Sequence, residues 1–251
     1  PNPAFSHVDV PLASTFILSS KEGKEAYVQP VIEGDQYRFT VRMGKPPAGA
    51  KEGTKLARAN FRCLISGAPI SGDYIKEEGQ SGRIGARLMA IVAEGVRGRV
   101  YLSPTQEHEA IALQAKPEWK PDVEFFQQAL GFRVGNYGMT KWSDLFTLRQ
   151  LMSLTTFSDL VSEAKERVHY DSMTAGIFDD GKPLCDGGSG ATAYAQALGI
   201  FITFAVSKVA DRNSALNTWA SLREHVSNTF KRQALAMTWD FSESNVFSGS
   251  S

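Results

Sequence analysis

The chain has 251 residues, no formal net charge at neutral pH, and 42% hydrophobic residues. This composition is typical of a globular protein with a sizeable core, and it excludes a polyanion binder that acts through overall charge. A nucleic-acid surface would therefore have to be a local basic patch. The two cysteines, Cys63 and Cys185, are too few for a disulfide framework, so we expect a reducing, cytoplasmic setting.

The two ends of the chain indicate a part of a longer protein. The sequence begins at Pro1 without an initiator methionine and finishes in the Ser/Gly-rich run VFSGSS. No signal peptide is recognisable near the start. We therefore expect an internal fragment, whose targeting signals, if any, lie elsewhere.

Residues 1–115 are predicted to be rich in β-strands. Short β-prone runs with glycines between them occur at 27–34, 36–44 and 98–105. The pattern of the run ARLMAIVAEG, residues 86–95, fits either a strand or a helix.

A polar loop, GKPPAGAKEGTK, follows the second of these runs and carries much of the positive charge of this half. Only Glu52 opposes the cations there. One interpretation is a solvated loop, since charge runs usually face water, and the other is a patch that contacts DNA phosphates. The cations in and after this loop are Lys45, Lys51, Lys55, Arg58 and Arg62.

Residues 116–251 are predicted to be mainly helical. The run PDVEFFQQAL, residues 121–130, predicts a short helix, and a glycine-rich loop follows it. Thr147 and Gln150 have the spacing of a capping box, and they precede a long amphipathic helix from about 148 to 169.

The most apolar segment is ATAYAQALGIFITFAVSKVAD, residues 191–211. Polar residues and a lysine interrupt it, and no charged flank precedes it. These features favour a buried core helix over a transmembrane span, and we expect no membrane partner.

Cys63, Ser66 and Gly67 have the spacing of a zinc knuckle, Cys-x-x-Cys-Gly, with a hydroxyl in place of the second sulfur. Structural zinc needs four thiolate or imidazole ligands, usually from two knuckles. The other cysteine lies far away in the chain and the histidines are scattered singly. We therefore assign no metal ligand.

A second candidate is the glycine-rich turn in LCDGGSGATAYA, residues 184–195. Such a turn at the start of a helix can present N–H groups to a phosphate or a cofactor carboxylate. No convincing buried strand precedes it and no Lys-Ser/Thr pair follows it, so a helix cap at Ser189 or Gly190 is the favoured interpretation.

The segment FKRQALAMTWDF, residues 230–241, interleaves aromatic and basic side chains. Lys231 and Arg232 can grip phosphates while Phe230 and Trp239 stack on bases. A partly buried helix end is the alternative interpretation. No motif for a catalytic triad or a metalloprotease is present, so we assign no catalytic residue.

The order of these motifs resembles the middle of the zinc-ribbon-containing family of adenine-specific DNA methylases, large bacterial proteins often encoded near phage-defence genes. PNPAF and FRCLISGAPI resemble the two knuckles of that family. YGMTKWSDLFTLRQLMSLTTFSDLV resembles its Leu-Phe-Thr-Pro-Arg-Gln-Leu region, with Leu148 in place of the proline. NTFKRQALAMTWDFSESNVF resembles the segment before its catalytic motif.

The resemblance implies a zinc ribbon that has lost its metal. Phe5 takes the second ligand position, Cys63 keeps the third and Ser66 replaces the fourth, while the first falls before Pro1. It also implies a methyltransferase that uses S-adenosylmethionine, with the cofactor loop upstream of this chain and an Asp-Pro-Pro-Tyr-type motif downstream. Pro46–Pro47 lacks the flanking residues of that motif.

We therefore expect an α+β fold: a β-rich, degenerate zinc-ribbon-like or insertion region (1–115), and a helical region (116–251) that belongs to or docks on a class I methyltransferase core. The expected function is that of an internal fragment of a DNA adenine N6-methyltransferase, inactive alone, with weak DNA contact. No cofactor is expected in this chain. The alternative is a non-catalytic protein-interaction or DNA-binding module of a defence-associated complex.

Overall fold

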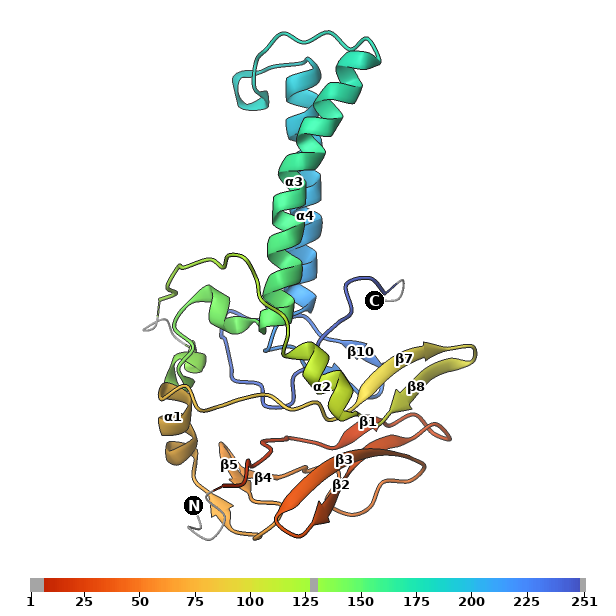
Figure 1. The fold of residues 1–251 in the computed structure, drawn as a ribbon, viewed down its shortest axis with the longest axis vertical. Helices are drawn as coiled ribbons and strands as arrows, with labels where there is room; N and C mark the ends of the chain where they lie inside the picture. The colour runs from red at the N-terminus through yellow and green to blue at the C-terminus, as the bar shows by residue number, and fades with distance from the viewer. Residues whose placement is uncertain (1–6, 127–130, 249–251) are drawn as a thin grey trace.

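The computed structural model describes residues 7–126 and 131–248. They form a broad base of small β-sheets and loops, from which a hairpin of two long helices rises (Figure 1). This architecture confirms the predicted α+β class. The zinc-ribbon-like region and the docking on a methyltransferase core stay predictions.

The largest sheet has three antiparallel strands in the order β1-β2-β3. Strands β2 and β3 pair along their whole length, and Gly34, with φ 68°, allows the two-residue turn between them. Val28 and Phe39 alternate inward and are 2% and 3% exposed, so this face forms a core. The predicted strands of this hairpin are confirmed; the three strands are Ile17–Ser19, Ala26–Glu33 and Gln36–Met43.

Three smaller antiparallel sheets complete the base. The ambiguous run 86–95 contains a strand, and the strand predicted at 98–105 is confirmed in its first half. Two short helices, α1 and α2, were not indicated by the sequence pattern. These elements are β4 (Lys55–Ala57), β5 (Asn60–Arg62), β6 (Pro69–Ile70), α1 (Gly72–Gln80), β7 (Ile91–Gly95), β8 (Gly98–Leu102), α2 (Gln106–Ala112), β9 (Trp219–Ala220) and β10 (His225–Val226).

The hairpin consists of α3 (Leu148–Thr174) and α4 (Ala191–Arg212). The predicted capping box starts α3: the Thr147 hydroxyl accepts a hydrogen bond from Gln150 N at 3.2 Å, and the Gln150 side chain accepts one from Thr147 N at 2.8 Å. The predicted long helix is therefore confirmed, and it extends beyond 169.

The prediction that residues 191–211 form a buried helix is wrong in one respect. The helix exists, but only 17% of its most apolar 18-residue window is buried. The physical reason is that α4 packs along α3 and rises away from the base, so one face alone is covered (Figure 1). Among the described residues, α4 is the one helix that is long and apolar enough to cross a membrane by length and composition.

The predicted helix at 121–130 is wrong for residues 121–126, and 127–130 lie outside the described residues. Glu124 forms a β-bridge with Lys141, and Phe125 N donates to Thr140 O at 3.1 Å. Phe125 is 4% exposed and packs in a cluster with Val134 and Leu145. Burial of this one aromatic ring outweighs the local helical propensity.

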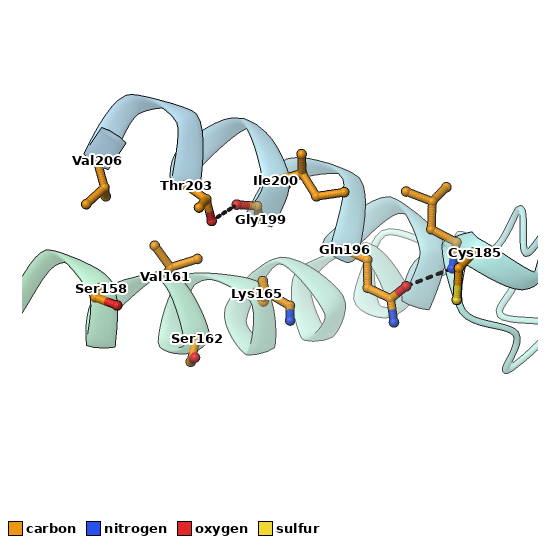
Figure 2. A pocket seen from close by; sticks show the side chains of 11 residues that line it. Ser158, Val161, Ser162, Lys165, Cys185, Gln196, Gly199, Ile200, Thr203 and Val206 are labelled. Carbon is orange, nitrogen blue, oxygen red and sulfur yellow. Dashed lines mark hydrogen bonds between the residues drawn. The ribbon is translucent and has the colours of Figure 1, made fainter. Parts of the chain in front are cut away.

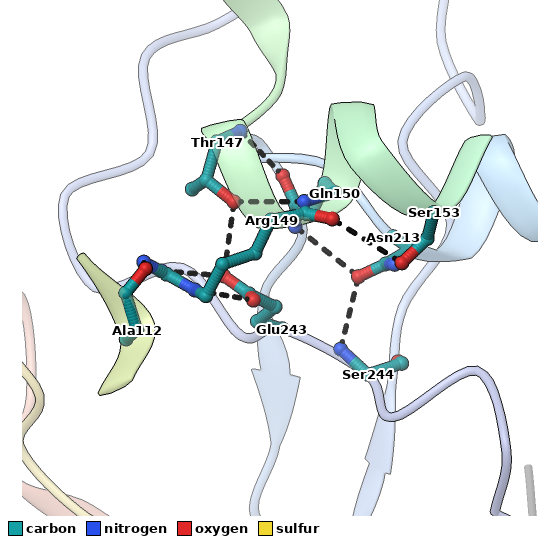
Figure 3. Close-up of polar contacts among 8 residues, drawn as sticks. All are labelled: Ala112, Thr147, Arg149, Gln150, Ser153, Asn213, Glu243 and Ser244. Atoms are coloured by element: carbon teal, nitrogen blue, oxygen red, sulfur yellow. Dashed lines mark hydrogen bonds and ion pairs between the residues drawn. The ribbon is translucent and has the colours of Figure 1, made fainter. Parts of the chain in front are cut away.

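Polar side chains join three segments at the foot of the hairpin (Figure 3). Gln150, which is 1% exposed, donates from Nε2 to Asn213 Oδ1 at 3.2 Å, and Ser244 N donates to the same oxygen at 3.0 Å. Arg149 donates from Nε and Nη2 to the two carboxylate oxygens of Glu243, both at 2.8 Å. The start of α3, the end of α4 and the segment after β10 are thus held together.

Arg149 does not pair with Asp144, although the two residues are only five apart in the sequence. Asp144 instead accepts hydrogen bonds from Thr140 N and Lys141 N, both at 2.9 Å. Its carboxylate caps the short 3-10 helix Trp142–Leu145, so its hydrogen bonds go to residues close to it in the sequence.

A buried carboxylate ties the β-rich part to the end of the chain. Glu224, which is 8% exposed, accepts hydrogen bonds from Ser19 Oγ at 3.0 Å and Tyr101 OH at 2.7 Å, and it pairs with Lys21. Its φ of 54° is unusual for a residue other than glycine, and these partners hold it there. Contacts therefore cross the boundary predicted at residue 115, which itself stays a prediction.

We expect Glu224→Ala to lower the free energy of unfolding by roughly 2–4 kcal/mol, because Ser19 and Tyr101 would lose a buried acceptor. The measurement is urea unfolding, with Glu33→Ala, an exposed carboxylate paired with Arg38, as the control that changes little.

The contribution of Glu224 to the free energy of unfolding should also depend on pH. Burial raises the pKa of Glu224, but hydrogen bonds from Lys21, Tyr101 and Ser19 outweigh it and place that pKa below its ordinary value. The stability lost in Glu224→Gln should be complete above about pH 4.3, the pKa of an unfolded glutamate, and should shrink as the pH falls through the lower folded pKa. A difference that is the same at pH 7 and pH 3 would contradict this assignment.

Candidate nucleic-acid interface

Lys45 and Lys51 lie on a loop that hydrogen bonds attach to the base of the molecule. Thr54 is 4% exposed; its hydroxyl donates to Pro11 O at 2.7 Å and accepts from Ala13 N at 3.0 Å. Ala50 is buried as well, and its carbonyl accepts from Phe16 N at 2.7 Å. Because both ends of the short segment 50–54 are fixed to the base, Lys51 between them is held outward and is exposed.

Gly53 explains why this anchoring needs a glycine. Its φ is 61°, and a Cβ there would lie 2.5 Å from Ala13 O. The loop backbone therefore approaches the segment before β1 more closely than a side chain permits.

The β4–β5 hairpin carries the next three cations. Arg58 lies in its turn with φ 54°, and Arg62 is exposed on β5 next to Phe61, which is fully buried. Lys55 on β4 is half-buried. Alternation along β5 places Phe61 in the core and Arg62 toward solvent.

None of these five cations is within 4.0 Å of a carboxylate of a described residue. By contrast, Arg38, Arg83 and Arg167 each form such a pair. The charges of the basic loop region, which we define as residues 45–62, are thus free to act on a ligand. The five cations are Lys45, Lys51, Lys55, Arg58 and Arg62.

The second predicted patch, Lys231 and Arg232, is exposed on an irregular segment after β10, and the helix end considered for it does not form. Trp239 does not serve as a stacking platform beside them. Its ring packs edge-on against Phe61 and Tyr137, with ring centroids 5.1 and 5.0 Å away. Only the two cations and the partly exposed Phe230 remain for a ligand.

The knuckle-like turn is well formed by hydrogen bonds alone. It connects β5 to β6, with Cys63 N donating to Ala68 O at 2.9 Å and Ser66 N donating to Cys63 Sγ at 3.5 Å. Gly67 has φ 69°, and Cys63 is 6% exposed in a core cluster with Phe61. Burial raises the pKa of the Cys63 thiol, and hydrogen bonds from Ser66 and Ile65 outweigh it and lower that pKa.

No group of three or more His, Cys, Asp or Glu residues with the geometry of a metal site occurs within 7–126 and 131–248. Phe5, the other residue that the resemblance aligned with a zinc ligand, lies outside these ranges. The absence of zinc stays a prediction.

The glycine-rich turn before α4 is a helix cap in which the N–H groups of Ser189, Ala191 and Thr192 already have acceptors. Gly190 is the N-cap residue, as the favoured interpretation predicted. Asp179 accepts hydrogen bonds from Thr192 N at 3.1 Å and from the Thr192 hydroxyl at 2.7 Å, and it pairs with His169 at 3.0 Å. His169 and Thr192 together hold the pKa of Asp179 far below its ordinary value.

The carboxylate of the neighbouring Asp180 also contacts this turn, where it accepts a hydrogen bond from Ser189 N at 3.1 Å. A Cβ at Gly188 would lie 2.1 Å from Lys182 O, so the glycine serves close backbone packing. With carboxylates already at the start of α4, an incoming phosphate would meet like charge.

A groove of about 630 Å³ runs between α3 and α4 (Figure 2). Gly199 lets the helices approach, since a Cβ there would lie 2.6 Å from the Lys165 stem. The lining residues include one charged group, Lys165, and no carboxylate. Of its polar side chains, Gln196 accepts a hydrogen bond from Leu184 N at 2.7 Å and Thr203 donates one to Gly199 O at 2.9 Å, so these two are used within the fold.

Sequence reasoning missed the residues that organise the fold, namely Glu224, the Arg149–Glu243 pair and the Asp179 cap. Their partners are distant in the chain, and no local pattern indicated them. The chain matches no protein-family model, no curated protein and no solved structure.

We expect purified chain to carry no stoichiometric zinc and to keep its melting temperature in a chelator, because Phe cannot ligate zinc and a neutral hydroxyl is a poor ligand. Elemental analysis and thermal unfolding check this. Cys63→Ala is the control: it should lower the melting temperature through lost packing, by the same amount with and without chelator. One equivalent of zinc per chain in the wild type would contradict the expectation.

Proposed function

We propose that this chain is a non-catalytic region of a DNA adenine N6-methyltransferase, and that its basic loop region contacts the phosphates of duplex DNA. The observation that carries the proposal is the set of five cations at 45–62 that have no carboxylate partner among the described residues. Cations on an anchored loop and on the β4–β5 hairpin beside it suit phosphate contacts, which position a protein on DNA without reading its sequence. In this proposal the protein acts in the cytoplasm.

The methyltransferase part of the proposal is supported by how two segments with the resemblance lie together. Residues 137–161 and 228–247 are far apart in the sequence, and Arg149 of the first pairs with Glu243 of the second (Figure 3). Thr147, from the first segment, also donates to Glu243 at 3.2 Å. Two segments that resemble one family and also contact each other fit a single structural unit.

Methyl transfer itself is assigned to parts of the parent protein outside this chain. Pro46–Pro47 lies in the basic loop without a neighbouring Asp or Tyr, and the glycine-rich turn before α4 is filled by Asp179 and Asp180. S-adenosylmethionine is therefore proposed as a cofactor of the parent protein, whose remaining parts are partners of this region.

A second candidate function is an interaction module of a defence-associated complex that has no methyltransferase activity. The exposed apolar side chains of the hairpin favour it, since contiguous exposed apolar surface marks interaction sites. The largest exposures on α4 are those of Phe201 and Phe204, 69% and 63%. DNA binding separates the phosphate-contact proposal from a module that binds protein alone.

We expect weak, salt-sensitive binding to duplex DNA. Replacing Lys51, Lys55 and Arg58 together by Ala should weaken binding and flatten the slope of log affinity against log salt by about 2 to 3 units, because each phosphate contact contributes about 0.9. Fluorescence anisotropy at a series of salt concentrations measures both quantities.

The matched control replaces three exposed cations that already have carboxylate partners, Lys76, Arg83 and Arg167. The same charge is removed, but the slope should stay near the wild-type value. If both triple variants change the slope equally, only net charge matters. If neither changes it, the basic loop region is a solvated surface and the interaction module is favoured.

A further inference from the structure

The outer face of α4 carries an apolar stripe at heptad spacing. Tyr194, Phe201 and Lys208 repeat every seventh residue, and Ala197 and Phe204 fall at the second heptad position between them. We call these five residues the α4 stripe. Heptad spacing of this kind is the pattern by which one helix packs along another.

The α4 stripe is not the surface that packs on α3. Ala195 and Gly199 are buried, and Gly199 faces the Lys165 stem of α3. Tyr194 is 49% exposed, Phe201 69% and Phe204 63%. The hairpin therefore uses one side of α4 internally and presents the opposite, more aromatic side to solvent.

We propose that the α4 stripe is the contact surface for a second copy of this chain, with the two α4 helices antiparallel about a two-fold axis. A two-fold contact requires a surface that is complementary to itself. In antiparallel heptad packing the first heptad position of one helix faces the second of the other. This rule places Phe201 opposite Phe204 of the other copy twice, at the centre, and places the small Ala197 opposite the long Lys208.

The antiparallel direction follows from the shape of the molecule. The base is much wider than the hairpin and lies at one end of it (Figure 1). Parallel hairpins would place the two bases at the same end of the pair. Antiparallel hairpins place each base beside the narrow loop between α3 and α4 of the other copy.

The exposed area limits a contact through the α4 stripe to a weak dimer. Aromatic side chains bury about 150–250 Å² each, so the exposed parts of Tyr194, Phe201 and Phe204 together offer roughly 350 Å² per copy. Specific interfaces begin near ~600 Å² per partner. Ala197 and the Lys208 stem supply part of the difference, and we expect a dissociation constant on the order of micromolar.

A lipid bilayer is a poorer occupant of this surface. Lys208 lies within the stripe, and α3, which runs alongside α4, carries charged residues along most of its length. A hairpin that is apolar on one helix alone cannot place both helices in hydrocarbon without a large cost for the charged one.

The experiment is sedimentation equilibrium of the whole chain from about 1 to 200 µM, a range that brackets a micromolar constant. The mass should rise from 27.4 kDa toward twice that value. Phe201→Glu with Phe204→Glu should weaken dimerisation by at least about 100-fold, because the central contacts would become repulsive. Both side chains are exposed in the single chain, so circular dichroism should show an unchanged fold.

Val96→Glu is the matched control, because Val96 is exposed on the β7–β8 turn of the base and lies outside the stripe. It should leave the association unchanged. A chain that stays monomeric at every concentration overturns the proposal and leaves the stripe to another part of the parent protein. Dimerisation that survives the double substitution overturns it too.

Cysteine cross-linking tests the direction of the helices. In a Cys185→Ser background, Ala197→Cys with Lys208→Cys should give a covalent dimer on oxidation. Ala197→Cys alone should give none, because the two copies of residue 197 would lie about 16 Å apart along the helix axis. Cross-linking by the single variant but not by the double overturns the antiparallel arrangement. The DNA assay is independent of this result, since the basic loop region lies on the base and the stripe on α4.

Discussion

The buried polar joint at the foot of the hairpin is the constraint on which this structure depends. Two helices alone bury one face each, so α3 and α4 do not have a core of their own. Gln150 and Asn213 are 1% and 2% exposed, and their hydrogen bond fixes where both helices leave the base. Arg149 and Glu243 brace the same point from the outside. Because an unpaired buried amide is costly, this joint has one favourable arrangement.

The base also has little core within any single element, because it consists of several small sheets instead of one large sheet. Each sheet buries only a few side chains, and the base is therefore held by contacts between distant segments. Glu224 links β1, β8 and the β9–β10 turn, while Trp239 packs on Phe61 and Tyr137. The same arrangement explains the accessibility of the basic loop region. Ala50 and Thr54 are fixed in the base, and Lys51 between them is exposed, as are Arg58 and Arg62 after them.

The two proposals assign different surfaces to different tasks. The first proposal assigns phosphate contact to the base, where an anchored loop would lose little freedom on binding. Association of two copies belongs to the hairpin, whose outer face carries the largest aromatic exposure of α4. A dimer would present two basic loop regions, and two linked contacts raise the effective affinity for a duplex beyond that of one.

The sequence by itself determined the local features that depend on near neighbours. The Thr147–Gln150 capping box, the strands around the turn at Gly34, the cap at Gly190 and the exposure of Lys51 all follow from short-range chemistry, and each is present. Tertiary structure decided what depends on distant partners. Phe125 is extended because a core cluster takes its ring, α4 is exposed because it has one neighbour, and Arg149 pairs with Glu243 instead of Asp144. No local pattern carries such information, because the energy of burial and of an ion pair such as Arg149–Glu243 resides in contacts between residues far apart in the chain.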